Sequence, residues 1–214
     1  MALSGSALSL KSALVLVDPE SGQIQRIIEL QYNPETLSRT FQVQSATGEA
    51  GDRLDVLRLK GPAIETIKLD AEFDATDDLA DPALHPVAAQ FGLQARLAAL
   101  ETVVYPDTGT IQTNMTLAMV GTLELTPQQA PLVLFVWSRS RIVPVRITEL
   151  SVTEELFDAA LNPIRAKVSL TLRVLSVNDL PQNHRGTSLY LAYQKTKERL
   201  AALGPQGTLG DLGM

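Results

Sequence analysis

The 214-residue sequence contains no cysteine, and this absence removes several classes of site. Disulfide bridges, thiolate metal sites and cysteine nucleophiles all depend on that residue. Histidine is nearly absent too, since His85 and His184 are the only two, and each stands beside turn residues. The sequence has no Gly-x-Ser-x-Gly elbow, no His-Glu-x-x-His motif and no glycine-rich phosphate loop. It therefore predicts no enzyme activity, no cofactor and no histidine-based metal site.

Aromatic residues make up only 5% of the chain, and acidic residues outnumber basic ones by 24 to 18. The net charge of −6 repels phosphate backbones, so we expect no nucleic-acid partner. No apolar run approaches the roughly 18–20 residues that cross a bilayer, so we expect no direct insertion into a membrane. The N-terminal stretch is partly apolar, but no basic residue precedes its apolar part and Lys11 interrupts it. These features predict synthesis in the cytoplasm without a secretion signal.

What the sequence does contain is alternation of apolar and polar residues, clearest at 164–174 (IRAKVSLTLRV). Every second side chain there is apolar, which predicts a β-strand with one buried face and one solvated face. At about 3.3 Å per residue this strand spans over ~30 Å, against roughly 5–6 residues for a usual strand. Such a strand can extend beyond the core of a small domain, and its free edge can pair with another chain. The segment therefore favours a building block for assembly over a catalyst.

Further strands are predicted along most of the chain. Apolar runs or alternation mark them at 13–17, 28–32, 37–43, 67–73, 115–119, 132–137 and 143–152. In the last of these the apolar parity changes between Ile147 and Leu150, and a β-bulge near Thr148-Glu149 would restore it. A connection around 157–163 then joins this strand to the long one as an extended antiparallel hairpin.

Two helices interrupt this pattern. Proline in the segment 81–86 predicts the start of the first, with Val87, Phe91 and Ala95 on the side that covers the sheet. The second is predicted from Thr187 to the Gly204-Pro205 stop. Six of its residues share one side: Leu189, Ala192, Tyr193, Thr196, Leu200 and Leu203.

Carboxylates are concentrated between residues 70 and 81. They are Asp70, Glu72, Asp74, Asp77, Asp78 and Asp81. Their spacing does not match the calcium loop, which needs a glycine at its sixth position and a closing glutamate. The favoured interpretation is a solvated strand face followed by an acidic helix start, and a divalent-cation site is the alternative.

The polar face of the long strand carries three basic residues, Arg165, Lys167 and Arg173. We hypothesise that they meet acidic groups such as Glu154 and Glu155, within one subunit or between subunits. The alternative is that these charges simply face water, because exposed ion pairs are common and weak.

Two local motifs carry a family resemblance. The first is the turn Tyr32-Asn33-Pro34, and the second comprises Phe157, Asn162, Pro163, Arg165 and Ala166. Together with the segments PLVLFVW and IKLDAEFDAT, they resemble the tube-type domain of contractile injection systems, which are phage-tail-like particles. More narrowly, the chain is similar to the baseplate family that connects the spike to the inner tube and often carries a LysM domain. Asn162 stands where that family more often has glycine, and asparagine tolerates a left-handed backbone.

The resemblance implies a mainly β (α+β) fold, a phage-tail-tube-like β-barrel or sandwich with a flanking helix. We expect residues 1–186 to form the tube-like β-barrel domain, and residues 187–214 to form a C-terminal helix and flexible tail. The part after Arg185 is too short for a LysM module, so no role of that module is carried over.

The resemblance also implies a structural baseplate hub protein, a hexameric ring that connects the spike to the inner tube and seeds tube assembly. Its implied partners are copies of itself, the spike protein, an inner tube or tube-initiator protein, and a baseplate wedge. Two alternatives stay open, the main inner-tube subunit and a small-ligand-binding β-barrel. The finished particle would stay in the cytoplasm, attach to a membrane or be released.

Overall fold

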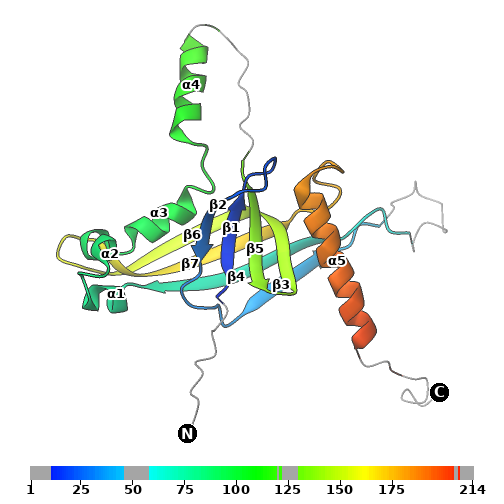
Figure 1. Ribbon diagram of the computed structural model, residues 1–214, viewed down its shortest axis with the longest axis horizontal. Helices are drawn as coiled ribbons and strands as arrows, with labels where there is room; N and C mark the ends of the chain where they lie inside the picture. Colours follow the sequence, from blue (N-terminus) through cyan, green and yellow to red (C-terminus); the bar gives the residue numbers. More distant parts are fainter. Residues whose placement is uncertain (1–10, 46–57, 120, 122–129, 205–206, 208–214) are drawn as a thin grey trace.

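A computed structural model describes residues 11–45, 58–119, 121, 130–204 and 207. The predicted mainly β (α+β) class is confirmed, because the described residues form one antiparallel sheet with flanking helices (Figure 1). The strands are β1 Ala13–Val17, β2 Ile24–Glu29, β3 Leu37–Gln42, β4 Ile64–Asp74, β5 Leu132–Ser138, β6 Arg141–Phe157 and β7 Pro163–Val174. The helices are α1 Thr76–Ala80, α2 Pro86–Phe91, α3 Gln94–Glu101, α4 Thr108–Met119 and α5 Arg185–Leu203.

The sheet is rolled. Its strand order is β2-β1-β5-β6-β7-β4-β3, so two strands that follow each other in the chain, β2 and β3, lie at opposite edges. A flat sheet of this order would place those edges about 29 Å apart, which the eight Cα–Cα steps from Glu29 to Leu37 could reach only in a straight, fully extended chain. The connection instead bends at residues 31, 32 and 35. The sheet therefore curves until β1, β2 and β5 cross over β4 and β7 (Figure 1).

The core lies on the inner face of this rolled sheet. Alternation predicted for β7 is confirmed, since Ala166, Val168, Leu170, Leu172 and Val174 are all buried. The facing residues of β4 and β5, including Phe73 and Phe135, are also fully buried. Each large side chain removed from water in this way contributes roughly 1.5–3 kcal/mol.

The predicted β-bulge is confirmed at Thr148. Ile147 pairs with Leu172 and Glu149 pairs with Thr171, so Thr148 is the extra residue. Its hydroxyl donates a hydrogen bond to the Thr171 carbonyl oxygen at 3.0 Å. The bulge bends the long strand β6 and returns its later apolar residues to the inner face. The predicted hairpin is confirmed as well, because β6 and β7 pair from Val145–Val174 to Phe157–Pro163.

The strand predicted at 115–119 is wrong, because this segment is the second half of helix α4. Apolar residues at positions 115, 117 and 119 fit alternation, but 115 and 119 are also one helical turn apart. Asp107 favours the helix over the strand. Its carboxylate accepts hydrogen bonds from the backbone N–H and the hydroxyl of Thr110 at 2.9 and 2.7 Å. Such a side chain starts a helix rather than a strand.

The single helix predicted after residue 86 is two helices, α2 and α3. They are separated at Gly92, whose φ of +55° is a backbone conformation that glycine adopts without strain. The break changes the helical phase, so Leu93, Leu97 and Leu100 are buried while the predicted Phe91 is 42% exposed.

Helix α5 begins at Arg185, two residues before the predicted start, and the His184 imidazole accepts a hydrogen bond from the Gly186 N–H at 3.1 Å. Its buried residues include Tyr190 and Tyr193. Leu200 and Leu203, predicted on the same side as Tyr193, are 50% and 77% exposed because the C-terminal half of α5 extends past the sheet (Figure 1).

Candidate assembly surfaces

The polar face of the β6–β7 hairpin holds most of the charged residues singled out in the sequence. The Arg165 guanidinium donates to the Asp74 carboxylate at 2.8 and 2.9 Å. Hydrogen bonds from Thr76, together with Arg165, lower the pKa of Asp74 from its ordinary 3.8 to about 2. This ion pair holds the end of β4 against the start of β7.

The other two basic residues also have partners within the subunit. Lys167 lies 3.4 Å from Glu155, and Arg173 lies 2.6 Å from Asp179. Glu154 is exposed opposite Ala166 and makes no ion pair with any described residue. These contacts fix where the five side chains stand, and their role in an interface between subunits stays a prediction.

The turn Tyr32-Asn33-Pro34 lies in the connection between the two edge strands. The Asn33 side-chain oxygen accepts hydrogen bonds from the backbone N–H and the hydroxyl of Ser12 at 2.9 and 3.2 Å. Tyr32 is 48% exposed beside it. The motif therefore ties the β2–β3 connection to the residue that precedes β1.

The second motif forms the tip of the β6–β7 hairpin. Asn162 does not adopt a left-handed backbone, because the positive φ angles of this hairpin lie at Leu156 (53°) and Leu161 (64°). The Asn162 amide instead donates to Asp158 at 2.8 Å and to the Gln90 carbonyl oxygen at 3.2 Å. These hydrogen bonds lower the pKa of Asp158 and join the hairpin tip to α2.

Phe157, Pro163 and Ala166 complete this motif. Phe157 pairs with Pro163 across the end of the hairpin and is 50% exposed, whereas Ala166 is fully buried opposite Phe73 of β4. The backbone N–H of Leu93 donates to the Pro163 carbonyl oxygen at 2.9 Å. The hairpin tip therefore supports the helices α2 and α3.

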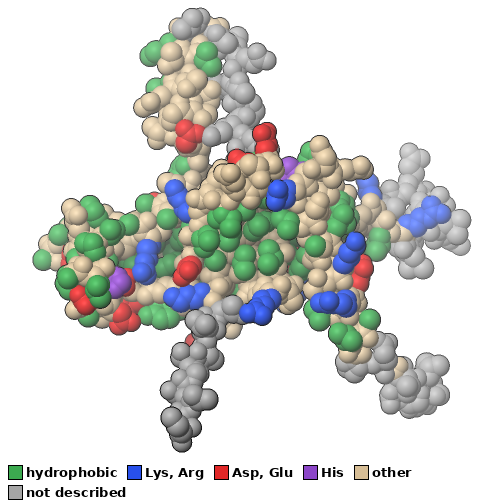
Figure 2. Space-filling view, viewed as in Figure 1, with side chains coloured by type: hydrophobic (Ala, Val, Ile, Leu, Met, Phe, Trp, Pro, Cys, Tyr) green, Lys and Arg blue, Asp and Glu red, His purple; other side chains and the backbone are tan. Residues whose placement is uncertain are grey.

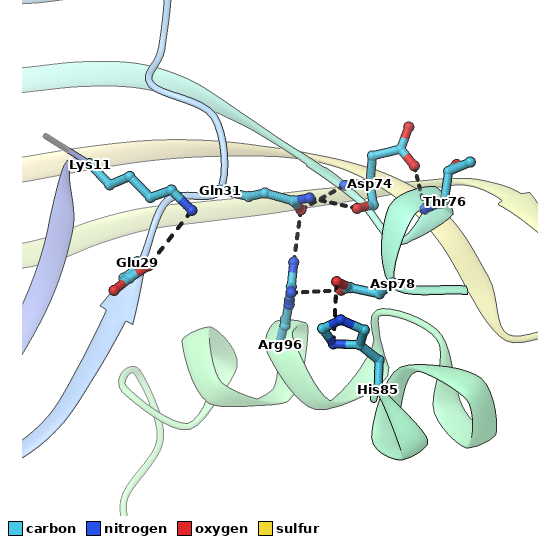
Figure 3. A network of polar contacts seen from close by, with 8 residues as sticks. All are labelled: Lys11, Glu29, Gln31, Asp74, Thr76, Asp78, His85 and Arg96. Atoms are coloured by element: carbon cyan, nitrogen blue, oxygen red, sulfur yellow. Dashed lines mark hydrogen bonds and ion pairs between the residues drawn. The ribbon is translucent and has the colours of Figure 1, made fainter. Parts of the chain in front are cut away.

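A polar network fastens α1–α3 to the sheet (Figure 3). Arg96 donates to the Gln31 side chain at 2.9 Å and to Asp78 at 2.7 Å, and His85 lies 3.6 Å from Asp78. The Gln31 amide exchanges hydrogen bonds of 2.7 and 2.9 Å with the backbone of Asp74. His85 and part of the acidic segment thus have structural contacts. Within the described residues no group of three or more histidine, aspartate or glutamate side chains is placed to hold a metal ion.

A buried ionic cluster fastens α5 to the opposite end of the sheet. Glu65 is 4% exposed, and its carboxylate accepts hydrogen bonds from Arg39 and Lys197 at 2.8 Å each and from the Tyr193 hydroxyl at 3.0 Å. Arg39 and Lys197 also stand 4.8 and 5.3 Å from the centre of the Phe41 ring. One feature of the sequence pointed to this cluster, an arginine at position 39 on an otherwise apolar strand face, but nothing in the sequence indicated its partners.

The ionisation of this cluster is set by two opposing effects. Burial raises the pKa of Glu65, but the hydrogen bonds and charges of Lys197 and Arg39 outweigh burial and bring it below the ordinary value of 4.5. Burial and the negative charge of Glu65 raise the pKa of Tyr193, so its hydroxyl stays a donor at neutral pH.

The two edge strands of the rolled sheet, β2 and β3, are candidate surfaces for pairing with other chains. In the part of the chain that the structure describes, β2 pairs only with β1 and β3 pairs only with β4. Ile24 and Ile27 on β2 are 62% and 55% exposed, and Phe41 on β3 is 46% exposed. An edge with free backbone groups and apolar side chains invites pairing with another chain.

A comparison with protein families agrees with this geometry. The family model described as contractile injection system tube protein matches residues 14–180, which span all seven strands. The chain belongs to this family. A search of curated proteins found no match.

The tube family is a structural one, so this chain is a tube-related structural component that assembles into a phage-tail-like particle. Within the described residues, the structure contains no helix with the length and apolar character needed to span a membrane.

Acid should weaken this tube-family domain. Glu65 and Asp74 both bind a proton less readily when folded than when unfolded, so each stabilises the fold above its unfolded pKa and loses this effect as the pH falls through its folded pKa. We expect the free energy of unfolding to decline between about pH 4.5 and pH 2. Urea titrations at pH 7, 4 and 3 measure it. Asp74→Asn should show a shallower decline, and constant stability down to pH 2 would contradict both assignments.

Proposed function

We propose that this protein is a baseplate hub component that forms a hexameric ring between the spike and the inner tube and seeds tube assembly. Membership in the tube family supports a ring, and the free edges of β2 and β3 supply the surfaces that a ring needs. A closed ring requires two different complementary surfaces on each subunit. The two edges differ, because Ile24 and Ile27 lie on one and Phe41, close to Arg39 and Lys197, lies on the other.

The two ends of the rolled sheet support an adaptor rather than a subunit that stacks only on itself. Helices α1–α3 lie at the hairpin end and α5 lies at the opposite end (Figure 1). An adaptor must offer unlike surfaces to a spike on one side and to an inner tube or tube initiator on the other. A baseplate wedge would contact the outer rim.

The charged hairpin face would line the channel or meet the neighbouring subunit. Lys167 and Arg165 with Glu155 form an exposed group that salt can screen. Glu154 lies on the other face of the hairpin, opposite Ala166, and has no ion-pair partner among the described residues, so we assign it to a neighbour. Arg173 forms an ion pair with Asp179 of the same subunit.

The main inner-tube subunit is the second candidate, favoured by the tube description of the family. The ligand-binding β-barrel receives less support, because Phe73 and Phe135 fill the interior of the rolled sheet. The hollow of about 380 Å³ beside Val103, Leu132 and Val145 lies between elements and is open on one side.

The test is the assembly state of the purified full chain, alone and mixed with the spike and inner-tube proteins of the same particle. Native mass spectrometry should find six copies, and electron microscopy should show discrete rings that bind the spike and start tubes. Filaments formed by the chain alone would assign it to the main tube instead. A monomer at every concentration, with and without the other components, would overturn the ring.

A further inference from the structure

Among the described residues, helix α4 does not pack extensively on any other helix or strand of its own subunit. It points away from the sheet (Figure 1), and none of its side chains is buried. Its twelve residues, Thr108–Met119, include no charged residue. Ile111, Met115 and Met119 follow one another at intervals of four residues and are 42%, 59% and 86% exposed. A helix of this length is marginal in water, so its apolar side calls for a surface to pack against.

A matching surface lies on the outer face of the sheet. Ile27, Val15 and Leu134 are in register across β2, β1 and β5. Figure 2 shows hydrophobic side chains gathered in the middle of this face. We name this set, together with Ile24, Val136 and Ile142, the outer apolar face. Exposed apolar patches that span several strands usually mark an interaction site.

The other half of the outer face is polar, and this contrast makes the apolar half distinct. Across β4, β7 and β6 the outward residues include Lys68, Asp70, Ser169 and Thr171. One rolled sheet thus presents a solvated outer half and an apolar outer half. A sheet face that only contacts water would need no apolar side chains, so the apolar half of the outer face calls for another explanation.

The charges around the two surfaces are complementary. The described residues 101–119, which include α4, contain two acidic residues, Glu101 and Asp107, and no lysine or arginine. Residues 131–146, which form the β5–β6 side of the outer apolar face, contain three arginines and no acidic residue. These are Arg139, Arg141 and Arg146, and none of them forms an ion pair with another described residue. Such an arrangement favours one orientation of docking over others.

We propose that α4 of one copy packs its Ile111–Met115–Met119 side on the outer apolar face of a second copy. The acidic segment that contains α4 then approaches the arginines of the β5–β6 hairpin. This inference rests on the proposed ring and deepens it, because α4 and the outer apolar face are the two unlike surfaces of a repeating contact. The partner is another copy of this chain.

Cross-linking tests the contact directly, because the natural chain has no cysteine to interfere. Two single variants, Met115→Cys and Ile27→Cys, are mixed and treated with a short bismaleimide, both as purified protein and within assembled particles. We expect a covalent dimer in the mixture and little in either variant alone. Thr113→Cys replaces Met115→Cys as the control, since residue 113 lies on the opposite side of α4.

A charge placed in the contact gives a second measurement. Met115→Glu should weaken association of the copies at least tenfold, whereas Thr113→Glu should change it less than twofold. Circular dichroism should show both variants folded, because both side chains are exposed. Rings that form normally in Met115→Glu, without the Met115–Ile27 cross-link, would overturn this contact and leave the proposed function standing. Absence of any multimer, in every mixture, would overturn both.

Discussion

Glu65→Ala should lower the free energy of unfolding by about 3–5 kcal/mol, as removal of one member of a buried ionic cluster typically does. The carboxylate is the common partner of Arg39, Lys197 and Tyr193, which come from β3 and α5. Without it, two cations are left beside each other, and of these four side chains only the Tyr193 hydroxyl, which accepts a hydrogen bond from Arg39 at 2.8 Å, remains as an acceptor. Urea unfolding followed by circular dichroism measures the loss.

Glu72→Ala on the same strand is the matched control. Glu72 is exposed on the outer face of β4, so its replacement should change the free energy of unfolding by less than about 0.5 kcal/mol. Glu65→Gln keeps the shape and one acceptor oxygen but loses the charge. Its loss of unfolding free energy should lie between the losses of Glu65→Ala and Glu72→Ala. Equal stability of Glu65→Ala and Glu72→Ala would show that the cluster does not hold α5.

This cluster also bears on the division at residues 186 and 187. Tyr190 and Tyr193 of α5 belong to the same core as the strands, and Lys197 completes the ionic cluster. The separation into a β-barrel domain and a C-terminal extension stays a prediction. The contacts lead us to expect that a chain ending before α5 would be less stable than the full chain.

Gly92→Ala should destabilise the protein by about 3 kcal/mol, for two independent reasons. Its φ of +55° is strained for any residue with a Cβ atom, at a cost of about 1–3 kcal/mol. An added Cβ would also collide with the carbonyl oxygen of Pro163, which is backbone and cannot move freely. The same oxygen accepts the hydrogen bond from Leu93, so α3 should loosen from the hairpin tip.

Gly121→Ala separates the cost of backbone strain from the cost of the collision with a neighbouring atom. Gly121 has a similar positive φ of +81°, but no atom of the described residues lies within 4 Å of an added Cβ. This variant should cost only the backbone strain. Hydrogen exchange in α3 should accelerate in Gly92→Ala and stay unchanged in Gly121→Ala. Slow exchange of α3 in both variants would contradict the role of the Gly92 contact.

The sequence predicted those parts of the fold that depend on neighbouring residues. Alternation in β7 and the parity change around Thr148 are local patterns, and both the strand and the bulge are confirmed. Helix α4 was missed because five residues cannot separate alternation from a helical turn, and the deciding Asp107 stands eight residues earlier than Met115. Gly92 was missed as a break because its positive φ follows from the close approach of Pro163.

The candidate surfaces were predictable only in part. The charges of the hairpin could be assigned to one face, but Asp74 and Asp179 as partners of Arg165 and Arg173 depend on the folded arrangement. The Glu65 cluster joins residues 39, 65 and 193, and no local pattern connects positions so far apart. The outer apolar face likewise appears only when β1, β2, β5 and β6 are set side by side.

The strand order has a consequence for biosynthesis. Strand β1 lies between β2 and β5, and Ala13 pairs with Val136, so the first strand made waits for a partner synthesised more than a hundred residues later. Pairings of such sequence separation fold slowly and leave apolar strands uncovered on the nascent chain. The β1–β2 hairpin can form early, but its second edge is filled only when β5 leaves the ribosome. The free edge of the N-terminal hairpin is therefore open to wrong pairing until β5 has been synthesised.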